Sequence, residues 1–271
     1  MSGTKVRFGL TFTEGSAEKE RALAPFVAEL SKRADITIET VTSPSYEALA
    51  AAMKQGELDL AWLPPIVFLR TDAKTTKPLV AIRRGSDGSY HSALIVRDDA
   101  PFKEAKDLTG SRAAWVDPWS AAGFIIPRLA LLTKGIDPRS LFRAESFQWS
   151  HKAAVMAVVD GAADVAGTYA HVDDDGKVVT GGWTNVKDAK VRVLESVGRV
   201  PPDLICASAS MDEALVAKLR DVLPAATPED ELGKAAQTLF QSASFARLGE
   251  TDYDGLRKDL SLAEEKKLFA S

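Results

Sequence analysis

The sequence has few of the residues that build disulfide frameworks and metal sites. Its 271 residues include one cysteine, Cys206, and three histidines. A single cysteine excludes an internal disulfide, and it leaves the cellular compartment open because many secreted proteins also lack disulfides. The histidines are too scattered along the chain to indicate a metal site, so no metal is expected.

Long apolar runs and an excess of positive charge are absent as well. No segment approaches the roughly 20 apolar residues of a membrane span, so no insertion into a membrane is expected. The formal net charge is −4. Without a block of Lys and Arg of the kind that follows a phosphate backbone, nucleic acid is not an expected partner. Residues 1–4 lead directly into the apolar residues 6–10 and leave no room for a signal peptide. The protein is therefore expected in the cytoplasm, or in the periplasm if a signal was removed.

Motifs for cofactors and catalysis are missing too. The chain has no nucleophile elbow, no P-loop and no Gly-x-Gly-x-x-Gly, so we expect no cofactor and assign no catalytic residue. Cys206 stands in an apolar run over residues 204–207, which indicates a buried structural thiol. The acidic run at residues 173–176 lacks the alternating oxygen ligands and distal Glu of a calcium loop, and it predicts a hairpin turn instead.

The sequence alternates strand and helix patterns, which predicts an α/β fold. Strand-like runs at residues 6–11, 36–41 and 58–63 are separated by segments with helical periodicity, such as Leu23, Phe26 and Leu30. The pattern restarts near Asp98, so we predict two lobes, with no internal repeat. Residues 1–96 and 204–271 form a discontinuous lobe 1, and residues 97–203 form lobe 2. Two crossover strands near residues 92–97 and 200–207 join the lobes, and the last three helices cover lobe 1.

Four predicted helices begin directly after strands. They start near Ser43-Pro44, Pro64-Pro65, Trp119-Ser120 and Ser150-His151. In such sheets ligands sit beyond the carboxyl ends of the strands. Helix N-termini expose unpaired N–H groups and about half a positive charge each, so together they predict a site for an anion.

Several short segments, in order, resemble the phosphonate-binding proteins of bacterial ABC transporters. They lie at residues 45–49 (Ser-Tyr-Glu-Ala-Leu), 56–61 (Gly-Glu-Leu-Asp-Leu-Ala), 90–92 (Tyr-His-Ser), 107–110 (Asp-Leu-Thr-Gly), 117–120 (Asp-Pro-Trp-Ser), 150–151 (Ser-His) and 161–166 (Gly-Ala-Ala-Asp-Val-Ala). The resemblance implies a two-lobed type II periplasmic-binding fold, with a ligand held in a cleft between the lobes.

The resemblance also implies roles for individual residues. Ser120 would donate its hydroxyl to a bound oxyanion, and further ligand contacts would come from Tyr46, Tyr90, Ser150 and His151. Asp203 follows Pro201-Pro202, where some members of the family place an acidic residue that binds a ligand amine. Alternative interpretations remain. The two serines would then be helix caps only, Tyr46 a packed helix residue, Tyr90 a strand residue over the hinge, and His151 and Asp203 solvated surface residues.

One departure from the family pattern bears on the ligand. The usual Ser-Thr-Ser-Gly run reads Ser-Ala-Ala-Gly here, at residues 120–123, so two hydroxyl donors are missing. A ligand oxygen left without a partner costs roughly 1 to 3 kcal/mol. Trp62, Trp119 and Trp149 lie beside the expected site, and they indicate an aromatic pocket unless they fill core or rim positions.

The sequence thus favours non-catalytic binding of a small organic anion or zwitterion, phosphonate-like or a carboxylate. The chain would be a monomer that serves an ABC permease, or a solute sensor with a signalling partner. The alternative is a cofactor-free enzyme that acts on a small organic acid, since the same fold hosts lyases of menaquinone biosynthesis.

Overall fold

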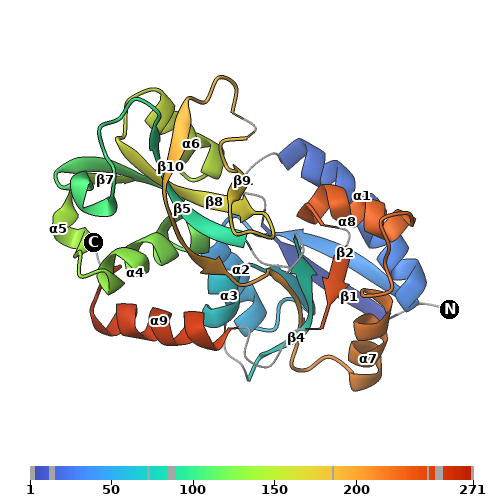
Figure 1. The fold of residues 1–271 in the computed structure, drawn as a ribbon. Helices are drawn as coiled ribbons and strands as arrows, with labels where there is room; N and C mark the ends of the chain where they lie inside the picture. The colour runs from blue at the N-terminus through green and yellow to red at the C-terminus, as the bar shows by residue number, and fades with distance from the viewer. Residues whose placement is uncertain are drawn as a thin grey trace. The chain divides into compact units, whose positions relative to one another are not determined.

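The chain folds as two compact units (Figure 1). The computed structural model describes residues 4–11, 16–71, 74–84, 90–184, 186–242, 244–247 and 253–269. Unit 1 consists of residues 1–88 and 202–252, and unit 2 of residues 89–201 and 253–271. Each unit has its own sheet with helices packed against it.

The sheet of unit 1 has the strand order β12-β4-β11-β3-β1-β2. Its strands are β1 (Thr4–Leu10), β2 (Ile36–Thr42), β3 (Leu60–Leu63), β4 (Thr76–Arg83), β11 (Leu204–Ser208) and β12 (Ser244–Ala246). Strand β1 pairs in parallel with β2 and β3, whereas β11 is antiparallel to both β3 and β4. Strands β1 to β4 therefore run in one direction. Their carboxyl ends lie along the same end of the sheet, its carboxyl edge.

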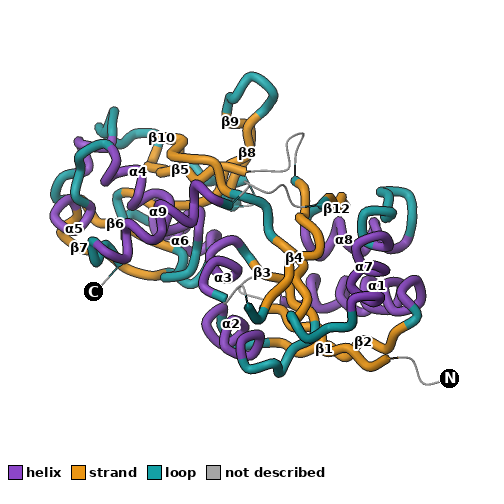
Figure 2. The backbone as a smooth tube through the Cα atoms, turned by 90° about the horizontal axis from the view of Figure 1, so that it is seen from below, coloured by secondary structure: helices purple, strands orange, loops and turns teal. Residues whose placement is uncertain are grey.

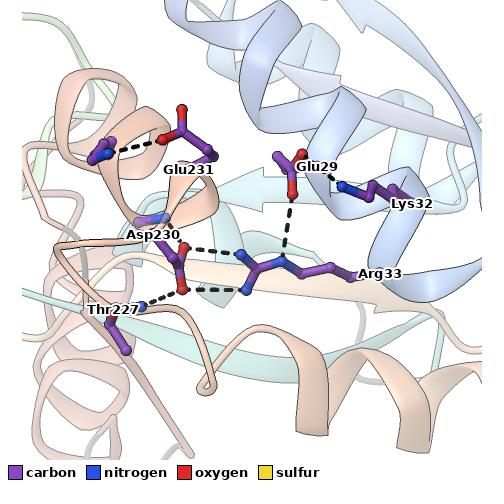
Figure 3. Close-up of polar contacts among 8 residues, drawn as sticks. Glu29, Lys32, Arg33, Thr227, Asp230 and Glu231 are labelled. Atoms are coloured by element: carbon purple, nitrogen blue, oxygen red, sulfur yellow. Dashed lines mark hydrogen bonds and ion pairs between the residues drawn. The ribbon is translucent and has the colours of Figure 1, made fainter.

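Helices cover both faces of this sheet. They are α1 (Ser16–Ala34), α2 (Tyr46–Lys54), α3 (Pro65–Arg70), α7 (Glu213–Val222) and α8 (Glu231–Phe240). Helices α1, α7 and α8 lie together on one face (Figure 2). There the ring of Phe26, at a predicted helical core position, lies 5.2 Å from that of Phe240 and 6.3 Å from that of Phe8. An ion pair between Arg33 and Asp230 ties the end of α1 to the start of α8, with Arg33 Nη2 3.0 Å from Asp230 Oδ1 (Figure 3).

The sheet of unit 2 has the strand order β10-β5-β8-β6-β7, and β9 pairs with β8. Its strands are β5 (Tyr90–Arg97), β6 (Ser111–Trp115), β7 (Phe142–Phe147), β8 (Val165–Val172), β9 (Val178–Gly181) and β10 (Val191–Val200). Strand β6 is parallel to β7 and β8, and β5 runs antiparallel between β8 and β10. The acidic turn at residues 173–176 joins the antiparallel strands β8 and β9, which confirms the predicted hairpin.

The helical segments of unit 2 are η1 (Ala105–Leu108), the π-helical turn η2 (Ala121–Ile125), α4 (Ile126–Thr133), α5 (Pro138–Leu141), α6 (His151–Val159) and α9 (Asp254–Glu265). The fully buried Trp115, the last residue of β6, packs between aromatic rings. Its ring lies 5.8 Å from that of Phe124 and 5.5 Å from that of Phe142. Its indole Nε1 donates to Glu145 Oε2 at 2.6 Å, so the one polar atom of this side chain is satisfied.

The same arginine–aspartate arrangement occurs in both units. In unit 1 the backbone N–H of Arg7 donates to Asp59 Oδ2 at 2.7 Å, while its guanidinium donates to both oxygens of the same carboxylate. In unit 2, Arg112 makes the same three bonds with Asp164, at 2.8, 3.0 and 2.8 Å. Both residues of the second pair lie 105 positions after their counterparts in the first.

The repeat continues into the helix that precedes each aspartate. Ser45 caps α2 and Ser150, 105 positions later, caps α6, and each helix ends before a glycine with a φ of 71°, Gly56 or Gly161. The prediction that the chain holds no internal repeat was wrong for these segments. Tyr46 and His151 consequently occupy equivalent positions, as the first residue of the helix that follows the second strand of each repeat.

The last helix differs from the prediction. Residues 253–269 were expected to cover lobe 1, but α9 and the residues after it belong to unit 2. There the buried Arg128 of α4 donates from Nη2 to the carbonyl oxygen of Leu268 at 3.1 Å and pairs with Glu145 of β7. Among the described residues, no helix is both long and apolar enough to cross a membrane.

Candidate functional site

In unit 1 the predicted site residues gather at the carboxyl edge of the sheet. Strands β1 to β4 all end at this edge, and the antiparallel β11 begins there, directly after Asp203. Helix α2 starts at the same edge after β2, where the hydroxyl of Ser45 accepts the backbone N–H of Ala48 at 3.1 Å. The cap is therefore Ser45, and not the predicted Ser43-Pro44. Helix α3 starts after β3 with Pro64 as its N-cap.

Tyr46, Trp62 and Asp203 form one network at this edge. The rings of Tyr46 and Trp62 lie edge to face with their centroids 6.3 Å apart. The indole Nε1 of Trp62 donates to Asp203 Oδ2 at 3.3 Å. These three residues come from a helix, a strand and the residue before a strand, far apart in the chain, and Asp203, predicted to lie in lobe 2, belongs to unit 1.

Sequence reasoning missed Arg84, which completes the network. Its Nη2 donates to Asp203 Oδ2 at 2.7 Å, and its Nε donates to the carbonyl oxygen of Phe240 at 2.8 Å. The side chains of Arg84 and Asp203 are 14% and 6% exposed, so this ion pair is largely removed from water. A signal was present: Arg84 directly follows β4, which contains the apolar run of residues 79–82 and ends at Arg83.

In unit 2 the turn after β6 presents Ser120. Asp117 Oδ1 accepts the backbone N–H of Trp119 at 2.7 Å, which shapes the turn. The hydroxyl oxygen of Ser120 accepts the N–H of Gly123 at 3.0 Å. Ser120 is therefore a helix cap, as the alternative interpretation held. A capping hydroxyl accepts with a lone pair and keeps its proton for a second partner, so the cap remains compatible with donation to an anion.

The two alanines that replace the family's hydroxyl residues are packed into the protein. Ala121 and Ala122 are 7% and 1% exposed in the π-helical turn η2, and the carbonyl of Ala122 accepts the hydroxyl of Ser92 at 2.7 Å. Each alanine side chain is a methyl group, so neither position carries the hydroxyl that Thr or Ser has in the family's usual run. The loss of side-chain donors expected from the sequence therefore holds in the folded chain.

The second helix start of unit 2 follows β7, the strand next to β6. Trp149 has a φ of 63°, and its backbone N–H donates to the carbonyl oxygen of Val116 at 2.7 Å. This bond fixes the turn that brings Ser150 into its capping position, where its hydroxyl accepts the N–H of Ala153 at 3.0 Å. The starts of η2 and α6 thus lie at the ends of adjacent parallel strands.

His151 and Tyr90 belong to a row of rings on β5, β8 and α6. His151 Nδ1 lies 3.0 Å from the hydroxyl of the fully buried Thr168, and its ring contacts Tyr169 edge to face at 4.9 Å. The rings of Tyr169 and His171 are 5.5 Å apart, and those of His171 and Tyr90 6.4 Å apart. His151 is partly buried and bonded, rather than a solvated surface residue.

The three tryptophans proposed for the pocket have different surroundings. Trp62 in unit 1 and Trp119 in unit 2 are half-buried. Trp149 is 65% exposed and lies 6.2 Å from the ring of Phe147, itself 36% exposed. Two of the tryptophans therefore stand at the carboxyl edge of unit 2, and Trp149 exposes apolar surface there.

The one cysteine is not placed as a reactive group. Burial raises the pKa of the Cys206 thiol far above its usual value, which makes it a poor nucleophile. In the ranges that the structure describes, no group of three His, Cys, Asp or Glu residues could hold a metal ion.

Comparison with known proteins decides the family. Residues 8–254 match the family described as "ABC transporter, phosphonate, periplasmic substrate-binding protein". The chain belongs to this family. Phosphonate-type substrate-binding proteins are components of ABC transporters that work with permease subunits and bind small molecules, and they are not enzymes. The predicted family is confirmed.

Three relatives illustrate the similarity. The Phosphate-import protein PhnD of Mycolicibacterium smegmatis is 22% identical over 263 residues, which cover 90% of this chain and 81% of that protein. XAC2383 from Xanthomonas citri, solved with chloride, has a TM-score of 0.81 at 20% identity and covers 97% of this chain and 99% of its own. The structure of XAC2383 bound to ATP has a TM-score of 0.78 at 19% identity, and the match covers 99% of this chain and 100% of that chain. PhnD1 from Prochlorococcus marinus in complex with methylphosphonate has a TM-score of 0.76 at 16% identity, with 98% and 99% covered. The type II periplasmic-binding fold is thereby confirmed.

Proposed function

We propose that this phosphonate-type binding protein binds a small organic anion and delivers it to an ABC permease. The observation that carries this proposal is the pair of serine-capped helix starts at the ends of the adjacent strands β6 and β7. Ser120 and Ser150 each accept one amide of the first turn and retain a hydroxyl proton to donate. The amides of both helix starts add partial positive charge, which favours an anion.

The ligands in the names of the relatives support an anion. They are phosphate for the Mycolicibacterium protein, chloride and ATP for XAC2383, and methylphosphonate for PhnD1. The organic part of the ligand is argued from this chain. Ala121 and Ala122 supply no hydroxyls for the oxygens of a bare tetrahedral anion, whereas Trp149 exposes apolar surface. A phosphonate, sulfonate or carboxylate with a short alkyl group satisfies both conditions. Eight residues would contact the ligand: Tyr46, Trp62, Tyr90, Trp119, Ser120, Trp149, Ser150 and His151. Asp203 would act through its neighbours Trp62 and Arg84.

A thermal-shift screen of the purified protein tests this function. The panel contains phosphate, alkylphosphonates, alkanesulfonates and short carboxylates, with neutral sugars and polyamines as controls. We expect one or more organic anions to raise the melting temperature, because a ligand that binds only the folded state stabilises it. The proposal fails if a neutral or cationic compound stabilises the protein and no anion does. Light scattering during size-exclusion chromatography tests the accompanying proposal that the chain is a monomer.

A further inference from the structure

The carboxyl edge of the unit 1 sheet holds a buried ion pair that the family resemblance did not predict. Asp203 Oδ2 accepts two donors, Arg84 Nη2 at 2.7 Å and Trp62 Nε1 at 3.3 Å. Arg84 is anchored a second time through its Nε, which donates to the carbonyl oxygen of Phe240 at 2.8 Å. A carboxylate and a guanidinium of opposite charge are thus paired beside Trp62, whose ring contacts that of Tyr46.

This pairing decides what the carboxylate can do for a ligand. A buried carboxylate without a partner strongly attracts a cation, because its own desolvation is otherwise uncompensated. Here a guanidinium already supplies the positive charge, and it does so through charge-assisted hydrogen bonds. A ligand ammonium that approached Asp203 would have to displace Arg84, or lie beside a like charge in a site removed from water.

We propose that the Arg84–Asp203 ion pair excludes ligands that carry an ammonium group, so that Arg84 is a residue that determines specificity. This inference rests on the proposed function and narrows its substrate class to anions whose organic part is uncharged. Asp203 then acts through its partners Arg84 and Trp62, without contacting the ligand.

Two phosphonates of nearly equal size isolate the effect of the ammonium group. Propylphosphonate ends in a methyl group where 2-aminoethylphosphonate ends in an ammonium. We expect the wild-type protein to bind propylphosphonate at least tenfold more tightly in isothermal titration. In Arg84→Gln the carboxylate of Asp203 loses its cation, and the ratio of the two dissociation constants should shift at least tenfold toward 2-aminoethylphosphonate. Adding Asp203→Asn to Arg84→Gln should abolish that shift.

Asp203→Asn alone covers the case in which Arg84→Gln fails to fold. It removes the carboxylate but keeps Arg84, so no preference for 2-aminoethylphosphonate over propylphosphonate should appear. Arg33→Gln is a matched control. It breaks the ion pair with Asp230 in the same unit, where α1 leads into the amino end of β2, and it should leave the ratio unchanged (Figure 3).

Several results would overturn the inference. Wild-type binding of 2-aminoethylphosphonate equal to or tighter than that of propylphosphonate contradicts it, as does an unchanged ratio of the two dissociation constants in Arg84→Gln. An equal loss of both ligands in Arg84→Gln would mean that Arg84 holds the anion itself. If no organic anion in the thermal-shift panel binds, the proposed function fails and the inference fails with it. If alkyl anions bind and amines bind better, only the inference fails.

Discussion

Trp149 is the residue whose environment a ligand is expected to change most. Its indole is 65% exposed, while its backbone is held at a φ of 63° by the bond to Val116. We predict that a bound organic anion shifts the fluorescence emission of the protein, and that Trp149→Phe removes most of this shift and weakens binding by roughly three- to tenfold. A variant that keeps both the full spectral change and the affinity would place Trp149 outside the site.

The sequence pointed to three candidate residues of unit 2 because each stands beside a helix start. Ser120, Ser150 and His151 belong to short motifs in which a strand ends and a helix begins, and such turns are readable from local sequence. Arg84 belongs to no motif. Its role depends on Asp203, 119 positions away, and on the carbonyl of Phe240. Contacts between residues so far apart in the chain depend on the order of strands in the sheet, and a local sequence pattern does not reveal that order.

Asp230 makes a separate prediction about stability and pH. Burial raises its pKa, but bonds from the backbone N–H groups of Gly233 and Thr227 and from Arg33 outweigh that effect and lower the pKa to about 2. Because the folded-state pKa lies below the unfolded value, the carboxylate stabilises the protein fully above about pH 4, and this contribution is lost as the pH falls toward 2.

We predict that Asp230→Asn lowers the free energy of unfolding by about 1 to 2 kcal/mol at pH 7 and by much less at pH 2. Urea unfolding across this range, with wild type and variant compared at each pH, measures the difference. A constant difference between pH 7 and pH 2 would show that charge at Asp230 is not the cause.

At the scale of the helix, the start of α6 is expected to serve stability and binding together. Removal of the capping hydroxyl in Ser150→Ala should lower the free energy of unfolding by roughly 1 kcal/mol, the usual contribution of an N-cap. It should also weaken anion binding about tenfold, because the hydroxyl donor is lost and the first turn frays. Asp212→Ala is the matched control. Asp212 caps α7, which follows β11 at the amino edge of the unit 1 sheet.

The control variant should lose similar stability but retain its affinity. Equal effects of the two variants on binding would mean that Ser150 acts only through general stability. Denaturant unfolding and titration with an alkylphosphonate give the two readouts for each protein.

The elements that the sequence did not reveal share a physical cause. Strand β7 is mostly exposed and carries charged residues such as Arg143 and Glu145, so it lacks the apolar alternation of a half-buried strand. The repeated Arg and Asp pairs were overlooked because the repeat preserves a hydrogen-bonded construction while most residues between its fixed points differ. By contrast, the uninterrupted apolar run of residues 204–207 indicated a strand, and β11 is found there.

For the whole molecule, the sequence indicated two α/β units and their approximate extent, but it did not indicate where the last helix packs. Helix α9 is amphipathic, with Leu256 and Leu260 buried, and such a stripe fits any apolar surface equally well. Its place in unit 2 depends on partners far back in the chain, Arg128 and, through it, Glu145. The final helices of a discontinuous fold are assigned by such contacts and not by periodicity.

The central claim is that this chain binds an organic anion in preference to inorganic phosphate, and one calorimetric comparison tests it. Wild type and Ala121→Thr/Ala122→Ser are titrated with phosphate and with propylphosphonate under identical conditions. We predict that wild type binds propylphosphonate at least tenfold more tightly than phosphate, because its alkyl group loses water against the aromatic surface. The variant, with two hydroxyl donors restored, should bind phosphate more tightly than wild type does. Micromolar or tighter binding of phosphate by the wild type, with no organic anion binding better, would contradict the account.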